Sequence, residues 1–323
     1  MQLGNFRVVY YCWNMFWCVR DAGVNSSGCN FRVLACLVEQ GDNARVAKHS
    51  ADRKSESGSD AQRRTPTFAS VTGELLLTLG VIVALFVVYQ VWWTDIEAGK
   101  LQAQASGDLE RQWADENPRP LTRDVEGAAF ARMFIPSFGP DFSYAVVQGT
   151  SDDALDRGPG HYVNTQLPGQ PGNFAVAGHR VGRGAPFNDL GYLSTCDAVV
   201  VETATTWYIY RVLPVGNDEN SSEISRRGAV QNCLHAPVVD EVVSGRYANL
   251  PGRYVTSPGN ISVLNPVPGT GGAFVSEGDL PILTLTTCNP RFSNKERMIV
   301  HAVLEHSESK VEGIVPAVLA GGE

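Results

Sequence analysis

The sequence has no surplus of positive charge. Its 323 residues include 26 Lys and Arg against 34 Asp and Glu, a formal net charge of −8. A general nucleic-acid binder neutralises phosphates with clustered Lys and Arg. The charge balance therefore argues against that class, and we predict no nucleic-acid partner. Acidity of this size favours solubility and identifies no partner by itself.

The sequence also has no cysteine pair with C-x-x-C spacing. Four of the seven cysteines lie in the first forty residues, and Cys196, Cys233 and Cys288 lie far downstream. Because zinc knuckles and thioredoxin-like motifs need the close spacing, we predict no metal and no cofactor. Outside the cytosol, Cys196 and Cys233 could form a disulfide or stay reduced. Both alternatives remain open, and the odd downstream cysteine is a candidate reactive thiol.

One long apolar run stands out against this ordinary composition. It extends over nineteen residues from Leu75 to Trp93 without a formal charge, enough to cross a hydrocarbon core of ~30 Å at ~1.5 Å per residue. Twelve of the residues are Leu, Ile, Val or Phe, so membrane insertion gains on the order of 4–7 kcal/mol before polar positions are subtracted. The alternatives are a buried helix of a soluble domain and a cleaved signal peptide.

The charges around this run predict its orientation. Arg53, Lys54, Arg63 and Arg64 precede it, whereas acidic residues follow it. The positive-inside rule then places the N-terminus in the cytoplasm and the C-terminal part outside. We therefore predict a single-pass protein of the cell membrane, held by an uncleaved signal anchor, with an extracytoplasmic C-terminal domain.

Composition divides the chain into five segments. Residues 41–67 are charged and small, which favours disorder, and the first forty residues hold no motif. The segment after the apolar run is polar and partly helical, as expected for a stalk that lifts the next domain off the membrane. The expected organisation is a cytoplasmic, disordered extension (1–70), a membrane anchor (71–94), a stalk or linker (95–125), a β-rich domain (126–310) and a C-terminal tail (311–323).

The β-rich domain contains eight short β-prone runs separated by Gly- and Pro-rich turns. This pattern is typical of an all-β barrel or sandwich. Two further runs, Asp152–Leu155 and Phe187–Leu193, look like single helical turns. The expected strands are Ala131–Ile135, Tyr144–Val147, Phe174–Ala177, Ala198–Glu202, Trp207–Val215, Val238–Val243, Ile282–Thr286 and Met298–Leu304.

Three of these runs have a reactive side chain at one end. One leads into Gly178 and His179, a second leads into Cys288, and Arg297 opens a third. A strand end is a rigid support of the kind that a nucleophile needs. Taken singly, each residue also has a plainer interpretation: an inert buried cysteine, a hydrogen-bonded histidine and a solvated arginine.

Taken together, these residues match a known family. The run Thr284-Leu285-Thr286-Thr287-Cys288 is the TLxTC signature of the sortases, and Arg297 fits the family arginine. From Phe130 to Leu304 the chain resembles the sortases, most closely those of class E from actinobacteria. Segments around the histidine that look like class E sequence are Gly160–Tyr162, Asn173–Arg180 and Gly184–Phe187. The resemblance implies an all-β fold: a closed, roughly eight-stranded barrel with short helices, preceded by one transmembrane helix.

The resemblance also implies the activity of a cysteine transpeptidase. Cys288 would attack the Thr–Gly carbonyl of a Leu-Ala/Pro-x-Thr-Gly sorting signal and form a thioacyl intermediate. His179 would carry the proton and Arg297 would stabilise the oxyanion. The expected partners are secreted proteins with a C-terminal sorting signal and a peptidoglycan precursor or cell-wall peptide amine.

Further residues are candidates for substrate binding and for the oxyanion role, besides Cys288, His179 and Arg297. Thr287, Thr286 and His161 are expected to bind substrate. Arg291 competes with Arg297 for the oxyanion role, but Arg297 enters an alternating strand that fixes its direction, so we prefer Arg297.

Two other functions stay open. One is another extracytoplasmic cysteine peptidase acting on cell-wall peptides, although the TLxTC strand speaks against it. The other is a membrane-anchored β-domain used for adhesion, in which Cys288 would have no catalytic part.

Overall fold

The computed structural model describes residues 68–114, 125–272 and 274–320. Most of the predicted N-terminal extension (1–70) therefore lies outside the described residues, as do the end of the predicted stalk and the last three residues. The helices of the β-rich domain are short: α2 (Asp152–Arg157), α3 (Glu223–Val230), α4 (Ala236–Val243), and the 3₁₀ helices η1 (Pro136–Phe138), η2 (Leu190–Tyr192), η3 (Ile261–Leu264) and η4 (Ala317–Leu319).

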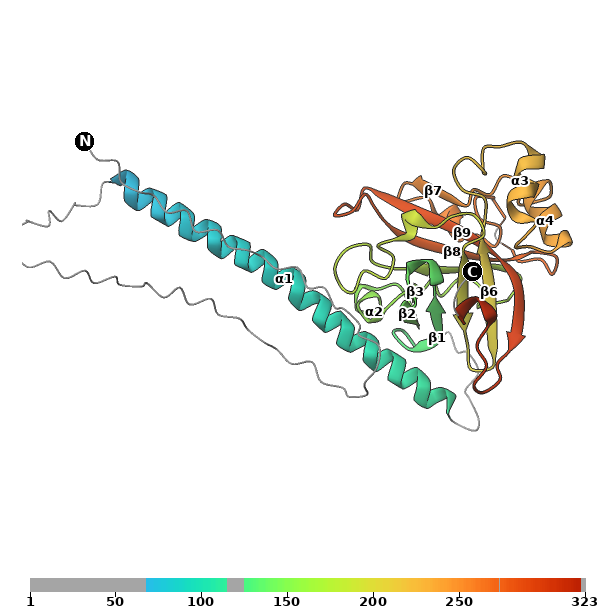
Figure 1. The fold of residues 1–323 in the computed structure, drawn as a ribbon, viewed down its shortest axis with the longest axis horizontal. Helices are drawn as coiled ribbons and strands as arrows, with labels where there is room; N and C mark the ends of the chain where they lie inside the picture. Colours follow the sequence, from blue (N-terminus) through green and yellow to red (C-terminus); the bar gives the residue numbers. More distant parts are fainter. Residues whose placement is uncertain (1–67, 115–124, 273, 321–323) are drawn as a thin grey trace, which may run out of the picture. The chain divides into compact units, whose positions relative to one another are not determined.

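A closed β-barrel forms the body of this domain (Figure 1). The hydrogen-bonded order is β6-β5-β1-β2-β3-β4-β8-β9, and an additional pairing of β6 with β9 closes the ring of eight; β7 pairs with β9 outside it. This confirms the fold that the sortase resemblance implied. The strands are β1 (Ala129–Phe134), β2 (Ser143–Gln148), β3 (Gly160–His161), β4 (Gly172–Ala177), β5 (Ala198–Glu202), β6 (Thr206–Val212), β7 (Arg253–Thr256), β8 (Pro281–Asn289) and β9 (Glu296–Ser309).

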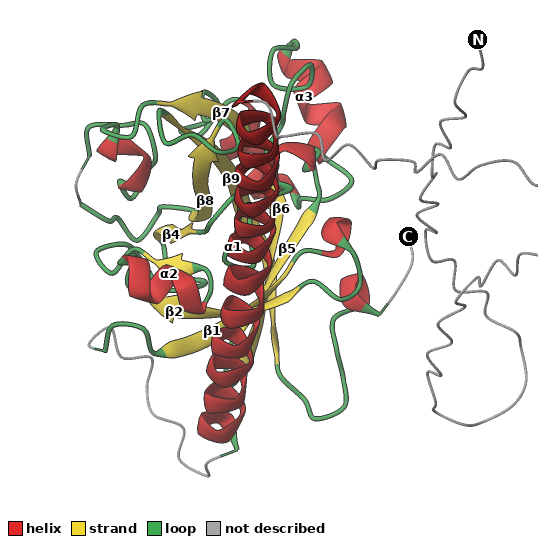
Figure 2. Ribbon diagram, turned by 90° about the vertical axis from the view of Figure 1, so that its left-hand side faces the viewer, coloured by secondary structure: helices red, strands yellow, loops and turns green. Residues whose placement is uncertain are grey.

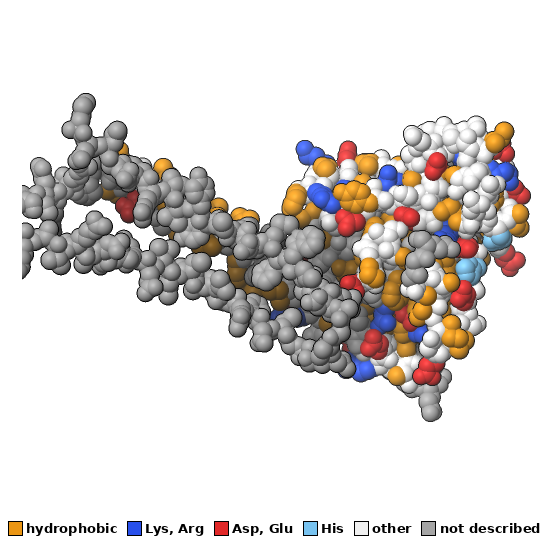
Figure 3. Space-filling view, viewed as in Figure 1, with side chains coloured by type: hydrophobic (Ala, Val, Ile, Leu, Met, Phe, Trp, Pro, Cys, Tyr) orange, Lys and Arg blue, Asp and Glu red, His pale blue; other side chains and the backbone are white. Residues whose placement is uncertain are grey.

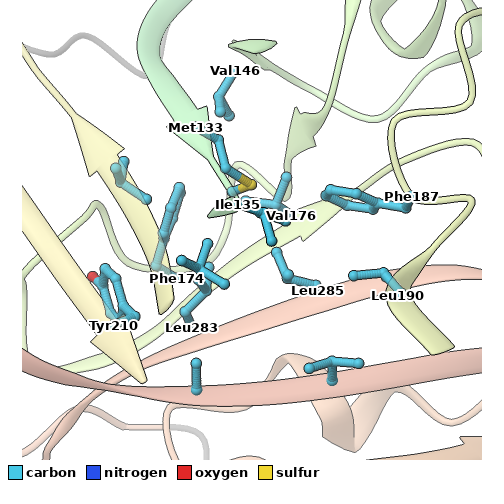
Figure 4. Close-up of a cluster of buried hydrophobic side chains, with 14 of the residues drawn as sticks. Met133, Ile135, Val146, Phe174, Val176, Phe187, Leu190, Tyr210, Leu283 and Leu285 are labelled. Atoms are coloured by element: carbon cyan, nitrogen blue, oxygen red, sulfur yellow. The ribbon is translucent and has the colours of Figure 1, made fainter. Parts of the chain in front are cut away.

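Alternation along the strands fills the barrel with apolar side chains. On β8, Leu283 and Leu285 are buried in the core, where they lie near Phe174 and Val176 of β4 (Figure 4). Successive side chains of a strand point to opposite faces. Thr284 and Thr286 of β8 therefore face the other side of the sheet. Because β8 has one face in the core and one face outside it, only the residues on the outer face can line a substrate groove.

The apolar run forms part of one continuous 46-residue helix, α1 (Phe68–Trp113). The stretch Val71–Trp113 holds a window with mean hydropathy 2.4 that is long and apolar enough to cross a membrane and is not buried in the protein. Leu75, Leu85 and Phe86 are among its exposed side chains, and apolar side chains are visible along the helix in Figure 3. This exposure argues against the alternative of a helix buried in a soluble domain, because such a helix hides its apolar surface.

The second half of α1 packs on the barrel. Ala98, Ala105 and Leu109 are buried, and their spacing of seven and four residues puts them on one helix face. Ala105 and Leu109 join a small core with residues of β2 and α2, and Figure 2 shows α1 running across this side of the domain. The predicted boundary between anchor and stalk, at residues 94 and 95, thus lies inside α1. The half of α1 after this boundary packs on the barrel.

One predicted strand is a helix. The run Val238–Val243 forms most of α4, with Pro237 at its N-terminal end. Its four valines are all buried. They occur at positions i, i+1, i+4 and i+5, which share one face of a helix. They pack with Ile282 and Val303 of the barrel in a second core. β-branched composition favoured a strand, but the spacing and this packing surface override that preference.

The other expectations differ little from the structure. Seven predicted strands overlap observed ones, and the predicted helical turn at Asp152–Leu155 lies within α2. The two short strands β3 and β7 have no counterpart among the predicted runs, because two to four residues carry too little pattern. Residues 316–320 of the predicted tail include η4, whose Val318 and Leu319 pack against β5 and β6.

The structure joins Cys196 and Cys233 in a disulfide, with the two Cα atoms 5.9 Å apart. Cys196 precedes β5, and Cys233 follows α3. The bond therefore ties the helical insertion to the barrel, and closing a loop of 37 residues stabilises a fold by about 3–4 kcal/mol. Of the two alternatives left open by the sequence, the structure shows the disulfide, and it leaves Cys288 as a free thiol.

A buried histidine makes the fold sensitive to acid. His301 on β9 is fully buried and its Nδ1 lies 2.7 Å from the carbonyl oxygen of Pro251. Burial lowers the pKa of His301 to about 4, whereas an unfolded histidine titrates near ~6.5. Between these pH values His301 is protonated in the unfolded chain but neutral in the folded protein. The free energy of unfolding therefore falls as pH is lowered.

We predict that the free energy of unfolding decreases by about 3 kcal/mol between pH 7 and pH 4 through this residue. His301→Asn keeps a donor for Pro251 but cannot be protonated, so its stability should depend less on pH. Chemical denaturation of both proteins from pH 4 to pH 7.5 measures the difference. Parallel pH curves for the two proteins would contradict the assignment.

Candidate active site

Cys288, His179 and Arg297 lie at one end of three adjacent strands. Cys288 of β8 is the register partner of Arg297 on β9. The pairing of β4 with β8 ends at Ala177 and Thr286, and His179 and Cys288 each follow two residues later. The Gly178 N–H donates to the Thr286 carbonyl at 3.0 Å and carries the pairing up to the histidine. The strand order thus brings together the three residues that the sequence predicted as catalytic.

The reactive side of β8 faces a groove. Thr286 and Cys288 point to one face, and their partners Ile299 and Arg297 share it, because alternate residues of paired strands lie on the same side. Cys288 is half-buried. A cavity of about 180 Å³ on this face is lined by Thr286, Arg297 and Ile299 together with Tyr162 and residues of the segment 256–264. This places Thr286, a predicted substrate contact, on the groove wall.

A second cavity of about 390 Å³ continues the groove away from Arg297. The two cavities share Tyr162, Ile261 and Leu264. The Tyr162 hydroxyl is 3.0 Å from the Thr286 hydroxyl. Buried Asn173 of β4 donates to the carbonyl oxygens of Val263 and Asn265, at 2.9 and 3.1 Å, and fixes the opposite wall. The groove therefore has the extended form that a peptide needs.

His179 is held by its backbone and surrounded by charge. The Phe187 N–H donates to the His179 carbonyl at 3.0 Å, and 22% of the His179 side chain is exposed. Its Nε2 lies 3.7 Å from Asp156 Oδ1 of α2. Burial lowers the pKa of His179, and the guanidinium of Arg183 lowers it further; the carboxylates of Asp156 and Asp152 oppose this and raise it.

Three arginines surround the end of β8. Arg297 Nη1 donates to the carbonyl oxygens of Asn294 and Glu296, at 3.2 and 3.0 Å, which holds the side chain in the loop before β9. Arg180 donates to the carbonyl oxygen of Cys288 at 3.2 Å. Arg291 instead lies against the η2 region, 3.4 Å from the Asn188 carbonyl oxygen. Both Arg291 and Arg297 thus contact backbone carbonyls, and the preference for Arg297 rests on its register pairing with Cys288.

Comparison with known proteins identifies the family. A profile of the Sortase domain family matches residues 133–305. Sortase SrtE1 of Streptomyces coelicolor is 33% identical over 269 residues, 80% of this chain but 64% of SrtE1. Sortase SrtE2 of the same organism is 30% identical over 255 residues, 76% of this chain and 84% of SrtE2.

Among solved structures, SrtF sortase from Corynebacterium diphtheriae is 50% identical, with a TM-score of 0.60 over 64% of this chain and 100% of that one. The chain belongs to the sortase family. The two Streptomyces relatives confirm the predicted class E. The chain spans less than two thirds of the length of SrtE1.

Two predicted substrate contacts of this sortase lie inside the protein. Thr287 is 3% exposed, it alternates with the groove-facing Thr286, and its hydroxyl donates to the Gly178 carbonyl at 2.8 Å. His161 is 0% exposed; its ring nitrogens lie 2.8 Å from Gln148 Oε1 and 3.0 Å from the Gln166 carbonyl oxygen. Spacing along a motif does not reveal which strand face is buried, and substrate contact by either residue stays a prediction.

Sequence reasoning missed several residues around the site. Tyr162 and Arg180 lie within the segments that resemble class E sequence but have no predicted role, and Asp156 directly follows the predicted helical turn Asp152–Leu155 with no predicted link to His179. For Tyr162 and Arg180, adjacency to His161 and His179 in the sequence could have indicated a place near the site. For Asp156 the sequence carried no such signal. No group of three or more His, Cys, Asp or Glu side chains forms a metal site within residues 68–114, 125–272 and 274–320.

Gly178 is required by its neighbours. A Cβ at this position would lie 2.5 Å from the ring of Phe187, which is fully buried and cannot move aside. We expect Gly178→Ala to lower the free energy of unfolding by about 1–3 kcal/mol and to displace His179. Gly228→Ala, in open space on α3, is the matched control and should be neutral or stabilising. Equal melting temperatures for both variants would contradict the prediction.

The Thr287 hydroxyl is predicted to position His179 by way of Gly178. Thr287→Val keeps the volume but leaves a buried carbonyl oxygen without its donor, at a cost of about 1–3 kcal/mol. Thr287→Ser keeps the hydrogen bond and should retain most activity. Steady-state kinetics and thermal melting of the two variants separate a positioning role from a loss of packing. Equal activity of the two variants would rule out the hydrogen bond as the cause.

Proposed function

We propose that this sortase is a membrane-anchored transpeptidase that cleaves a Leu-Ala/Pro-x-Thr-Gly sorting signal between Thr and Gly and transfers the protein to a cell-wall amine. The observation that carries the proposal is the placement of Cys288 beside Arg297 in register, at the level of His179, on the groove side of β8. Family membership supports the same chemistry.

The first half-reaction forms a thioester. The Cys288 thiolate attacks the Thr carbonyl carbon and forms an S–C bond. The negative charge that develops on the carbonyl oxygen is stabilised by Arg297, whose guanidinium has five N–H donors and uses only some of them on the loop carbonyls. His179, protonated, donates its proton to the leaving glycine amine as the C–N bond breaks.

The second half-reaction reverses these roles. The amine of a peptidoglycan precursor or cell-wall peptide attacks the thioester carbon, and His179 accepts its proton. The S–C bond breaks and Cys288 leaves as the thiolate. A new amide joins the protein to the acceptor, so the energy of the original peptide bond is conserved and no cofactor is required.

The anchor and the disulfide support an extracytoplasmic location. α1 contains a stretch that can span a membrane, and basic residues that include Arg53, Lys54, Arg63 and Arg64 precede it, which favours a cytoplasmic N-terminus. A disulfide between Cys196 and Cys233 persists in oxidising compartments. Both observations support the proposal that the catalytic domain lies outside the cell, within reach of cell-wall substrates.

The test uses the full chain in lipid nanodiscs, because the second half of α1 packs on the barrel. Fluorogenic Leu-Ala-x-Thr-Gly and Leu-Pro-x-Thr-Gly peptides are incubated with wild type and with Cys288→Ala, with and without an amine acceptor. We expect cleavage by wild type only, a transpeptidation product when the acceptor is present, and an acyl-enzyme mass on Cys288. Folded wild-type protein that cleaves neither peptide but cuts cell-wall muropeptides would favour the peptidase alternative.

A further inference from the structure

The carboxylate of Asp156 lies next to the imidazole of His179. His179 Nε2 is buried and has no hydrogen-bond partner among the described residues, yet Asp156 Oδ1 lies 3.7 Å away. Asp156 belongs to α2, whose N-terminus is capped by the Ser151 hydroxyl and whose Ala154 is buried against α1 and β2. The carboxylate is therefore carried by an ordered helix and not by a loose loop.

The same carboxylate oxygen also binds an arginine. Arg183 pairs with Asp156 Oδ1 more closely than His179 does. Arg183 has a φ of 53° and lies between two glycines with positive φ, Gly182 and Gly184. The loop is held at Gly184, whose N–H donates to Asp95 of α1 at 3.3 Å and whose carbonyl oxygen accepts from the Tyr144 hydroxyl at 2.9 Å. One carboxylate is thus shared between an imidazole and a guanidinium.

We propose that Asp156 and Arg183 are positioning residues for His179, with Asp156 holding the imidazole by its Nε2 edge and Arg183 limiting how much of the carboxylate's charge reaches the ring. The inference rests on the proposed function of His179 and adds a device that sets its orientation and protonation. With Nε2 directed at Asp156, Nδ1 is the nitrogen left to exchange protons with the amine at the thioester.

The charges around His179 come from three elements. α2 contributes Asp152 and Asp156, and the loop after β4 contributes Arg183, with opposing effects on the pKa of His179. From α1, Asp95 faces the same loop through Gly184. Removal of Asp156 takes away a group that raises the pKa and leaves Arg183 unpaired, so the pKa of His179 falls further. Removal of Arg183 has the opposite effect, because the carboxylate then acts on the imidazole alone.

The decisive measurement is the titration of His179 itself. ¹³C-labelled histidine is followed by NMR in the full chain in nanodiscs, in a Cys288→Ala background, and the His179 signal is assigned by its loss in His179→Asn. We expect a lower pKa in Asp156→Asn, a higher pKa in Arg183→Gln, and an intermediate value in the double variant. Asp153→Asn, three residues earlier on α2 and exposed to solvent, is the matched control and should titrate as wild type.

Activity provides the second readout. Asp156→Asn should lower kcat by about tenfold, a part of the ~10²–10⁴ that acid–base catalysis contributes, with KM little changed because the peptide groove lies on the β8 face. Asp156→Glu should restore part of kcat, which a purely structural role would not predict. Thermal melting of each variant confirms that it is folded.

The outcomes separate the two proposals. If wild type cleaves no sorting peptide, the proposed function fails while the titration still tests the pairing of Asp156 with His179. If wild type is active and Asp156→Asn keeps both the wild-type pKa of His179 and the wild-type kcat, the positioning role is overturned. Equal shifts in Asp156→Asn and Asp153→Asn would also overturn it, because they would show only a general loss of charge.

Discussion

The pairing of β8 with β4 on one side and with β9 on the other is the constraint on which the site depends. Parallel pairing with β4 brings the chain that leads into His179 to the level of Cys288. Antiparallel pairing with β9 puts Arg297 directly opposite Cys288. Because a shift of one residue would turn every β8 side chain to the other face, the hydrophobic register of the barrel also sets the geometry of the chemistry.

The two faces of β8 divide the signature motif between structure and reaction. Leu285 and Thr287 face the inside, where the leucine packs in the barrel core and the threonine holds the Gly178 carbonyl. Thr286 lines the groove, and Cys288 lies on the same face of the strand. The motif therefore consists of two interleaved sets: one packs the strand in its place, and the other is the set proposed to meet the substrate.

Elements outside the barrel extend this organisation to the membrane anchor. α1 docks through Ala105 and Leu109 on β2 and α2, and Asp95 at the start of its polar half accepts a hydrogen bond from the loop after His179. The helix that carries the anchor is thus also a packing partner of the elements that surround the histidine. This arrangement links the helix that is apolar enough to span a membrane to the local structure around His179.

The sequence by itself determined the family, the candidate catalytic residues, a helix long and apolar enough to span a membrane, and most strands, because a nineteen-residue apolar run, β-prone segments and the TLxTC signature are local patterns. The tertiary structure decided the rest. Val238–Val243 became a helix because a helix buries its four valines against the barrel. Burial placed Thr287 and His161 inside. Asp156, distant from Cys288 in sequence, reached His179 only because α2 packs beside β2. Such outcomes depend on which surfaces meet, and no local pattern records that.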